Sequence, residues 1–363
     1  MKRQPAKNRS HGMNAYPRIN IYLERITHNA RTIIKYCTTR GVDVTAITKG
    51  VCGEPHIAAC LATSGAVALG DSRLLNLRKI HSLPCEKWLI RIPMISECAQ
   101  VIEYANVSLA SETTVIQALN QEAIRQRKRH GILLMADMGD RREGCLGQAE
   151  LGRLAEQVES SPGLFLKGFG TNLGCYGFVQ TTDENMARFC EMVSGITTNQ
   201  DLTISAGNSS ALLWLGETHQ RGLINHLRLG EAILLGRERR NFTQMPGTVD
   251  NAFCLEVEIV ELKEKPSLPS GAIGKDSFGR SPNLPDLGVH WRAIAAIGRQ
   301  DVEPEALCPD DPDILILGAS YDHLLLQVPP RRYHPGDILS FRMQYPAVVR
   351  VMGSEYVHKN ICG

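Results

Sequence analysis

The chain has 363 residues, enough for two domains or for one large barrel with an added domain. Charged residues make up 21% and hydrophobic residues 43%, the balance of an ordinary soluble globular enzyme. Lys and Arg number 40 against 38 for Asp and Glu, a net charge of +2 that argues against nucleic acid or an anionic membrane as the main partner.

Residues 1–15 are expected to form a flexible tail. Met1–Asn14 is basic and polar without an apolar segment, so it does not look like a secretory signal. No apolar stretch approaches the roughly 18 residues of a transmembrane helix. The eleven cysteines are scattered, without a C-x-x-C pair, which favours a reducing, cytoplasmic location. Several lie inside apolar runs, as reduced core cysteines do: Cys37, Cys60, Cys190 and Cys254.

Residues 16–245 show a repeated alternation of strand and helix patterns. Short apolar runs predict eight strands: Val44–Thr48, Ala66–Leu69, Trp88–Ile92, Val107–Leu109, Ile132–Ala136, Leu164–Phe169, Leu202–Ser205 and Leu227–Leu229. Between them, apolar residues recur at helical spacing in stripes that begin at Ile26, Ile116, Leu151 and Met186. The alternation predicts an α/β fold, a parallel (β/α)8 TIM barrel.

Lys49 directly follows the first of these strands and stands against Gly50 and Gly53. Parallel α/β barrels place their chemistry at the carboxyl ends of the strands, so this lysine is a candidate catalytic residue. A partly desolvated amine has a lowered pKa and can attack a carbonyl group. Taken alone, a solvated lysine at the end of a strand is the simpler interpretation.

Polar residues also follow the other strands, and in a barrel all these ends meet on one face. They are Asp71–Arg73, Arg91, Ser111–Glu112, Asp137, Thr171–Asn172, Asn208–Ser209 and Arg228. The turns Gly207–Ser209 and Arg228–Glu231 offer hydroxyl and backbone N–H groups to an anion, with a plain helix cap as the alternative. Because barrels often bind phosphate after their last two strands, an anion site is predicted here.

Residues 246–363 are predicted to form an all-β domain. Phe253–Leu262 alternates apolar and polar residues as a strand does. Further strands are predicted at Ala293–Ile297, Ile314–Leu317, Leu324–Val328, Ile338–Phe341 and Val348–Met352. The Pro/Gly-rich stretches 265–288 and 300–312 are predicted to be loops, and the early strand Arg18–Tyr22 is expected to pair with this domain.

In their order and spacing, these motifs resemble the alanine racemase group of pyridoxal 5'-phosphate (PLP) enzymes, most closely its ornithine racemase branch. The matching segments are Thr48–Gly53, Asp137–Gly144, Gly170–Gly177, Asn225–Gly236, Ala296–Val302 and Leu317–Leu324. The resemblance covers nearly the whole chain after Tyr16. It implies a PLP-binding barrel followed by a β domain, and an enzyme of amino-acid metabolism.

The resemblance also implies roles for individual residues. Lys49 would hold PLP as a Schiff base and act as one of the proton-transfer bases. Arg228 would face the pyridine nitrogen and leave it unprotonated, because a guanidinium does not readily give up its proton; this suits racemisation over transamination. The other implied cofactor contacts are Asn172, Asn208, Ser209, Gly230, Glu231 and Tyr356, and the implied substrate contacts are Arg142, Asp137 and Tyr321.

Racemisation needs a second base on the opposite face of the reacting carbon. Alanine racemases take a tyrosine from the partner subunit's β domain, and the aligned position here falls near Arg299. The candidates are therefore Asp301, Asp322 and His323, with Tyr321 as a further one. If the β domain completes the neighbour's site, the enzyme is a homodimer with shared active sites.

Acidic residues carry the inference about the substrate. Asp140 and Glu143 flank Arg142, and Glu112 ends another strand. They suit the cationic side chain of ornithine or another basic amino acid, although solvated loop charges are the simpler interpretation. The sequence thus predicts a PLP-dependent racemase acting on ornithine or a similar amino acid.

Two alternatives remain open at the level of the sequence. One is a PLP lyase of the same fold, either a decarboxylase or a metal-assisted dehydratase or aldolase. The metal-assisted version needs a His/Cys pair, and His358 and Cys362 offer one at a disordered-looking chain end, so no metal is expected. The other is a non-catalytic PLP carrier or regulator. Such proteins resemble the barrel alone, so the additional residues after Asn251 argue against this alternative.

Overall fold

The computed structural model describes residues 15–275, 279 and 285–363; the expected tail before residue 15 and part of the predicted 265–288 loop lie outside this range. The chain divides into two compact units. The barrel unit comprises Tyr22–Ala252 and Ile361–Gly363. The C-terminal unit comprises Phe253–Asn360 and the described residues up to Ile21.

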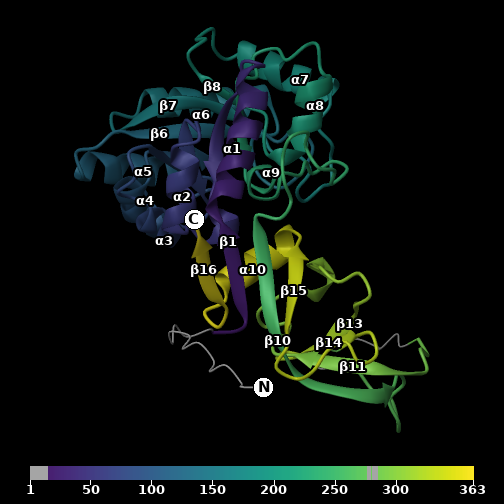
Figure 1. Cartoon of the computed structure of the whole chain (residues 1–363). Helices are drawn as coiled ribbons and strands as arrows, with labels where there is room; N and C mark the ends of the chain where they lie inside the picture. The colour runs from purple at the N-terminus through teal and green to yellow at the C-terminus, as the bar shows by residue number, and fades with distance from the viewer. Residues whose placement is uncertain (1–14, 276–278, 280–284) are drawn as a thin grey trace. The chain divides into compact units, whose positions relative to one another are not determined.

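Strands β2 to β9 form a closed parallel barrel, which confirms the predicted (β/α)8 fold (Figure 1). They are β2 (Asp43–Ile47), β3 (Ala68–Asp71), β4 (Glu86–Leu89), β5 (Val107–Ala110), β6 (His130–Met135), β7 (Leu164–Gly170), β8 (Thr203–Ser205) and β9 (His226–Leu229). Each overlaps a strand predicted from an apolar run. Pairing of β2 with β9, with Thr45 opposite Arg228, closes the barrel.

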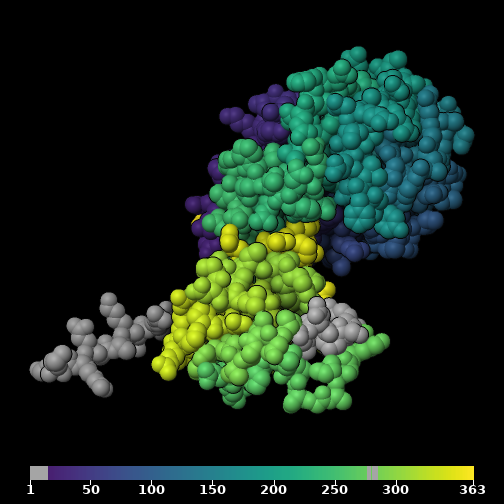
Figure 2. All heavy atoms as spheres, turned by 90° about the vertical axis from the view of Figure 1, so that its right-hand side faces the viewer, coloured from purple at the N-terminus to yellow at the C-terminus, as the bar shows by residue number. Residues whose placement is uncertain are grey.

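Helices follow the strands and cover the barrel. They are α1 (Leu23–Thr38), α2 (Pro55–Ala62), α3 (Leu74–Lys79), α4 (Cys98–Tyr104), α5 (Thr113–Arg125), α6 (Gln148–Glu159), α7 (Asp183–Ser194), α8 (Leu212–Glu217) and α9 (Glu231–Leu235). The second half of this unit, coloured teal, covers much of its visible face in Figure 2. The predicted stripes lie on α1, α5, α6 and α7, where their apolar residues are buried. No helix in the described part of the chain is long and apolar enough to cross a bilayer.

Apolar side chains from neighbouring strands fill the barrel. One buried cluster comprises Ala68, Trp88, Val107, Leu109, Leu133 and Met135. Residues two apart in a strand share a face, so these side chains line one side of their strands. Full burial of a large apolar side chain stabilises the fold by about 1.5–3 kcal/mol, so the cluster gives the site a rigid base.

An antiparallel sheet forms the C-terminal unit, as predicted. In pairing order its strands are β12 (Leu307–Pro309), β15 (Ile338–Met343), β10 (Phe253–Pro266), β11 (Val289–Ala295), β14 (Leu324–Gln327) and β13 (Leu315–Ala319). β1 (Arg18–Tyr22) pairs with β10, with Arg18 opposite Glu256, which confirms the expected pairing of the early strand.

Three details of this unit correct the sequence predictions. Val348–Met352, predicted as a strand, lies in helix α10 (Tyr345–Gly353); a proline occupies its first turn and the buried residues recur at helical spacing. The stretch 300–312, predicted to be a loop, contains the strand β12, which has only three residues and is too short to show an alternating pattern. The chain end, expected to be disordered, forms β16 (His358–Cys362), which pairs with β1 and carries His358 and Cys362.

Candidate functional site

Lys49 lies at the carboxyl end of β2, at the start of the 3₁₀ turn η1 (Lys49–Val51). The preceding Thr48 donates a hydrogen bond to Asp71 Oδ2 over 2.7 Å, which fixes this strand end against β3. Gly53 has a φ of +61°, and an added Cβ would lie 2.8 Å from Asn76 Cβ. Only glycine fits there, so the turn that follows Lys49 packs closely against α3.

The surroundings of Lys49 lower the pKa of its ammonium group. Its side chain remains accessible to solvent, but the protein around it removes part of its hydration, which is the main cause of the lowered pKa. Nearby Arg142 and Arg239 lower the pKa further, while Cys175 and Asp71 oppose them. A larger share of this amine is therefore neutral, as a nucleophile or a base requires.

Arg228 extends from β9 into the interior of the barrel, where it is 5% exposed. Its Nη1 donates to Ser205 Oγ over 2.5 Å and its Nη2 to the Thr171 carbonyl over 2.8 Å. An added Cβ on Gly170 would lie 3.3 Å from Nη1 and 3.0 Å from Leu133 Cδ2, so this glycine leaves room for the guanidinium. Burial lowers the pKa of Arg228 to about 10, and the group stays protonated at neutral pH.

The loops after β7 and β8 are joined by side-chain amides. Asn208 Nδ2 donates to Asn172 Oδ1 over 3.1 Å and to the Leu173 carbonyl over 2.9 Å. Asn208 Oδ1 accepts from the backbone N–H of Ser210 over 2.8 Å. Two buried atoms here, Thr171 Oγ1 and Asn172 Nδ2, have no hydrogen-bond partner among the described residues. Buried polar atoms that lack a hydrogen-bond partner within the protein can bind a ligand.

The loop after β8 also meets the start of α9. Ser209 Oγ accepts a hydrogen bond from the backbone N–H of Ala232 over 3.3 Å, and Ser209 itself is buried. Glu231 is buried as well, which raises the pKa of its carboxyl group, and Arg239 Nε, 3.2 Å from Glu231 Oε2, opposes this effect. Ser209 therefore lies beside the Gly230–Glu231 turn, as the predicted anion site requires.

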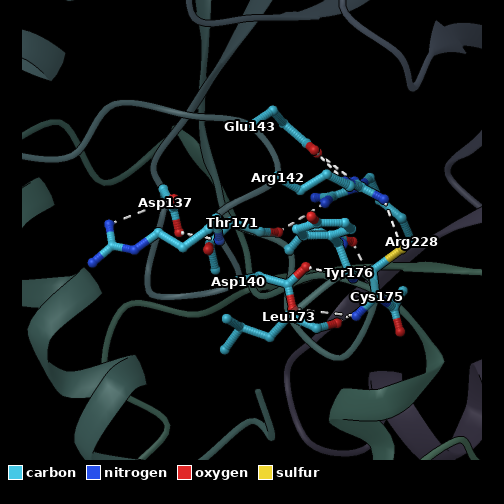
Figure 3. A network of polar contacts seen from close by, with 12 residues as sticks. Asp137, Asp140, Arg142, Glu143, Thr171, Leu173, Cys175, Tyr176 and Arg228 are labelled. Carbon is cyan, nitrogen blue, oxygen red and sulfur yellow. Dashed lines mark hydrogen bonds and ion pairs between the residues drawn. The ribbon is translucent and has the colours of Figure 1, made fainter. Parts of the chain in front are cut away.

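Arg142 stands in the loop after β6 and contacts the loop after β7 (Figure 3). Its guanidinium donates to both carboxylate oxygens of Glu143 and, over 2.8 Å, to Cys175 Sγ. The hydrogen bonds that Arg142 donates to Glu143 raise the pKa of Arg142. Glu143 also raises the pKa of Arg228, so Arg142, Glu143 and Arg228 lie within electrostatic reach of one another.

Two carboxylates near Arg142 shape the loops around it. Asp137 Oδ1 accepts the backbone N–H of Gly139 over 2.7 Å and that of Arg141 over 3.2 Å. Asp140 is buried and accepts the backbone N–H groups of Cys175 and Tyr176 over 3.3 and 2.9 Å (Figure 3). Their oxygens hold the backbone that carries Arg142 and Cys175.

The candidates for a second base lie in the C-terminal unit, on two adjoining loops. The backbone N–H of Arg299 donates to the Ser320 carbonyl over 2.8 Å, and that of Gln300 to the Tyr321 carbonyl over 3.1 Å. An added Cβ on Gly298 would lie 2.1 Å from the Tyr321 carbonyl oxygen, so this contact requires glycine. The loop beyond Tyr321 carries Asp322 and His323, whose side chains are exposed.

Asp301 and Tyr356 are linked through one serine of the same unit. Ser354 Oγ donates to Asp301 Oδ1 over 2.6 Å and accepts the backbone N–H of Tyr356 over 3.1 Å. The Tyr356 side chain is exposed. The sequence-predicted residues therefore form two groups, one at the barrel strand ends and one on the loops of the C-terminal unit.

Ser205 and His226 were missed by the sequence analysis. Ser205 Oγ lies 2.9 Å from His226 Nδ1, and His226 Nε2 lies 2.8 Å from Thr45 Oγ1, all of them buried. Burial holds the pKa of His226 well below its usual range, and Arg228 adds to the effect. Since arginine can only donate, Ser205 Oγ accepts from it and can donate its own proton to neutral His226. The available sequence signal was a polar residue at or beside each of two apolar strands, Ser205 in the seventh predicted strand and His226 just before the eighth.

Arg239 was also missed, because it follows the barrel pattern in a run of charges that looks solvated. Its effect on Lys49 and its ion pair with Glu231 depend on the folded chain. Cys175 stands in a motif that the sequence analysis quoted, but its contact with Arg142 had no sequence signal.

Comparison with known proteins identifies the family and the fold of this chain. The family model for "Alanine racemase, N-terminal domain" matches residues 21–238. An ornithine racemase of Acetoanaerobium sticklandii is 38% identical over 351 residues, 95% of this chain and 99% of that protein. A lysine racemase of Thermotoga maritima is 34% identical over 350 residues, 95% of this chain and 98% of that protein.

A solved structure, the alanine racemase from Bartonella henselae with covalently bound pyridoxal phosphate, shares the fold. Its TM-score is 0.71 at 14% identity, over 96% of this chain and 100% of that chain. The sequence match extends over nearly the whole length of both relatives, so it includes the C-terminal unit as well as the barrel. This chain belongs to the alanine racemase family.

Proposed function

We propose that this protein is a PLP-dependent racemase that interconverts the L and D forms of a basic amino acid, with ornithine as the first candidate and lysine as the second. Two full-length relatives, an ornithine racemase and a lysine racemase, support this substrate class. The observation that carries the proposal is that Lys49, Ser209 and Arg228 lie at or just after the carboxyl ends of the neighbouring barrel strands β2, β8 and β9, where an amine, a hydroxyl and a guanidinium would line one binding region.

The described residues fit PLP. Lys49 offers an amine with a lowered pKa for covalent attachment, and Ser209 with the backbone at Gly230 and Glu231 would bind the phosphate. Asn172 has a buried amide nitrogen without a partner among the described residues, which suits a contact with the cofactor. When bound, PLP supplies an electron-withdrawing ring that stabilises the charge left on Cα after its proton is removed.

The protein's own groups would direct this chemistry toward racemisation. Lys49 would take up and return the Cα proton on one face of the substrate, because a lowered pKa favours the neutral amine that a base requires. Arg228 would face the ring nitrogen and keep its own proton, since a pKa of about 10 lies far above neutrality. The nitrogen would then remain unprotonated, which favours return of the proton to Cα.

We place the second base in the C-terminal unit of a second copy, which makes the enzyme a homodimer with shared sites. Asp301, Asp322 and His323 are the candidates, and Tyr321 and Tyr356 would approach substrate and cofactor from the same unit. Mixing Lys49→Ala subunits with subunits that lack the second base should restore activity, because one site of a mixed dimer would be intact. If no pair of inactive variants restores activity, the shared site is wrong.

Chiral chromatography tests the proposed reaction directly. L-ornithine, L-lysine and L-alanine are incubated separately with the protein and PLP. The expected result is the D enantiomer at constant total amino acid, fastest with ornithine or lysine. Loss of amino acid with release of an amine or an aldehyde would instead support the lyase alternative. Bound PLP without any reaction would support the carrier. We also propose a cytoplasmic location, which the scattered cysteines support.

A further inference from the structure

We infer that the ion pair between Arg142 and Glu143 recognises both ends of a basic amino acid: Arg142 binds the α-carboxylate and Glu143 binds the side-chain ammonium group. This inference rests on the proposed function. It assigns the choice of a basic over a neutral substrate to a single carboxylate in the loop after β6.

The hydrogen bonds of the other acidic candidates support this choice. Asp137 accepts two backbone N–H groups of its own loop, and Asp140 accepts two from the loop after β7. A carboxylate that leaves such partners exposes buried N–H groups, which is unfavourable. Glu112 is exposed just before α5, where a charge is well solvated. Asp137 Oδ2 also lies 3.7 Å from Arg141 Nη1, whereas Glu143 pairs with Arg142, the residue proposed to bind the α-carboxylate.

Glu143 is also well placed with respect to the other charges. Its side chain is 16% exposed, and its carboxylate contacts Arg142 through both oxygens. It acts electrostatically on Arg228, the group proposed to face the cofactor ring, as well as on Arg142. Figure 3 shows Glu143, Arg142 and Arg228 in one network, with Cys175 as a further partner of Arg142.

A basic amino acid can exchange this ion pair for two new ones. Its α-carboxylate takes the place of Glu143 on Arg142, and its ammonium group takes the place of Arg142 on Glu143. Each of the four charges keeps an opposite partner. A neutral side chain of the same length would occupy Arg142 but leave the largely buried Glu143 carboxylate without a cation, which is unfavourable. The pair therefore discriminates by charge.

A simpler role for Glu143 is to orient Arg142, and L-norvaline distinguishes the two. It has the carbon chain of ornithine without the terminal amine. For Glu143→Gln we expect kcat/KM for L-ornithine to fall by on the order of 10- to 100-fold, mainly through KM, while that for L-norvaline stays level or rises. Glu156→Gln, an equal charge change on the exposed face of α6, should alter neither value.

An equal fall for both substrates would overturn the inference and leave Glu143 as a positioning residue for Arg142. Unchanged kinetics with L-ornithine would overturn it as well. Calorimetric titration separates this inference from the proposed function. If the native protein binds L-ornithine more tightly than L-norvaline, and Glu143→Gln loses that preference, the recognition stands even where no racemisation is seen.

Discussion

Replacing Ser205 by alanine removes one hydroxyl that serves two buried groups. Its Oγ accepts from Arg228 over 2.5 Å and lies 2.9 Å from His226 Nδ1. Without it, a guanidinium N–H and an imidazole nitrogen are left without this partner in the barrel interior. Each such group costs about 1–3 kcal/mol, so the free energy of unfolding should fall by roughly 2–6 kcal/mol.

The barrel offers a matched control in Ser108. Its Oγ lies 2.9 Å from Nε2 of the buried His130, and among the described residues no arginine donates a hydrogen bond to this pair. Ser108→Ala should therefore cost only about 1–3 kcal/mol. Urea denaturation of both variants, monitored by circular dichroism, measures how much more free energy of unfolding is lost at Ser205, where Arg228 is attached, than at Ser108.

The two variants should also differ in the reaction they catalyse. Ser205 holds one side of the Arg228 guanidinium, so its loss should loosen the group proposed to face the cofactor ring. We expect Ser205→Ala to convert a larger share of substrate to the 2-keto acid, measured by coupled reduction with NADH, while Ser108→Ala behaves like the native protein. Equal stability losses together with equal keto-acid yields in the two variants would show that Ser205 does not hold Arg228 in place.

Three further predictions concern the charged groups of the site. Lys49→Ala should abolish the visible absorption of bound PLP and all racemisation; an unchanged spectrum would contradict covalent attachment at Lys49. Arg239→Gln removes a cation that lowers the pKa of the Lys49 amine, which is free to act as a base once substrate has taken its place on PLP, so the rise of kcat with pH should move to higher pH; a move to lower pH would contradict the assigned sign. Arg228→Glu should allow the ring nitrogen to be protonated and raise the keto-acid yield, and an unchanged yield would remove the role given to Arg228.

Much of the fold could be predicted because buried parallel strands are continuous apolar runs. Their order identified the barrel, and barrel geometry then brought Lys49, Ser209 and Arg228 to one face. In the C-terminal unit the pattern was weaker. Val348–Met352 is rich in β-branched residues and looked like a strand, but Pro346 and its buried neighbours start a helix there. A three-residue strand such as β12 carries too few residues for any pattern.

The fine structure of the site depends on contacts that spacing does not encode. Sequence proximity to Arg142 made Asp140 and Glu143 look alike as partners for a cationic substrate, and the same segment contains Asp137, an implied substrate contact. The fold separates them, because two of these carboxylates bind loop backbone and one binds the arginine. The contact of Ser205 with Arg228 arises because β8 and β9 are neighbours in the barrel, with Ser205 paired to His226.

The proposed racemisation of L-ornithine is tested most directly by following its Cα proton in deuterated water, with protein and PLP present. Circular dichroism reports the optical activity, and NMR reports deuterium at Cα. We expect the circular dichroism signal to decay to zero, with deuterium at Cα of both enantiomers. Exchange with retained optical activity would mean that Lys49 acts without a second base. If the protein visibly binds PLP but shows no deuterium exchange and no decay of optical activity, the result would contradict a racemase.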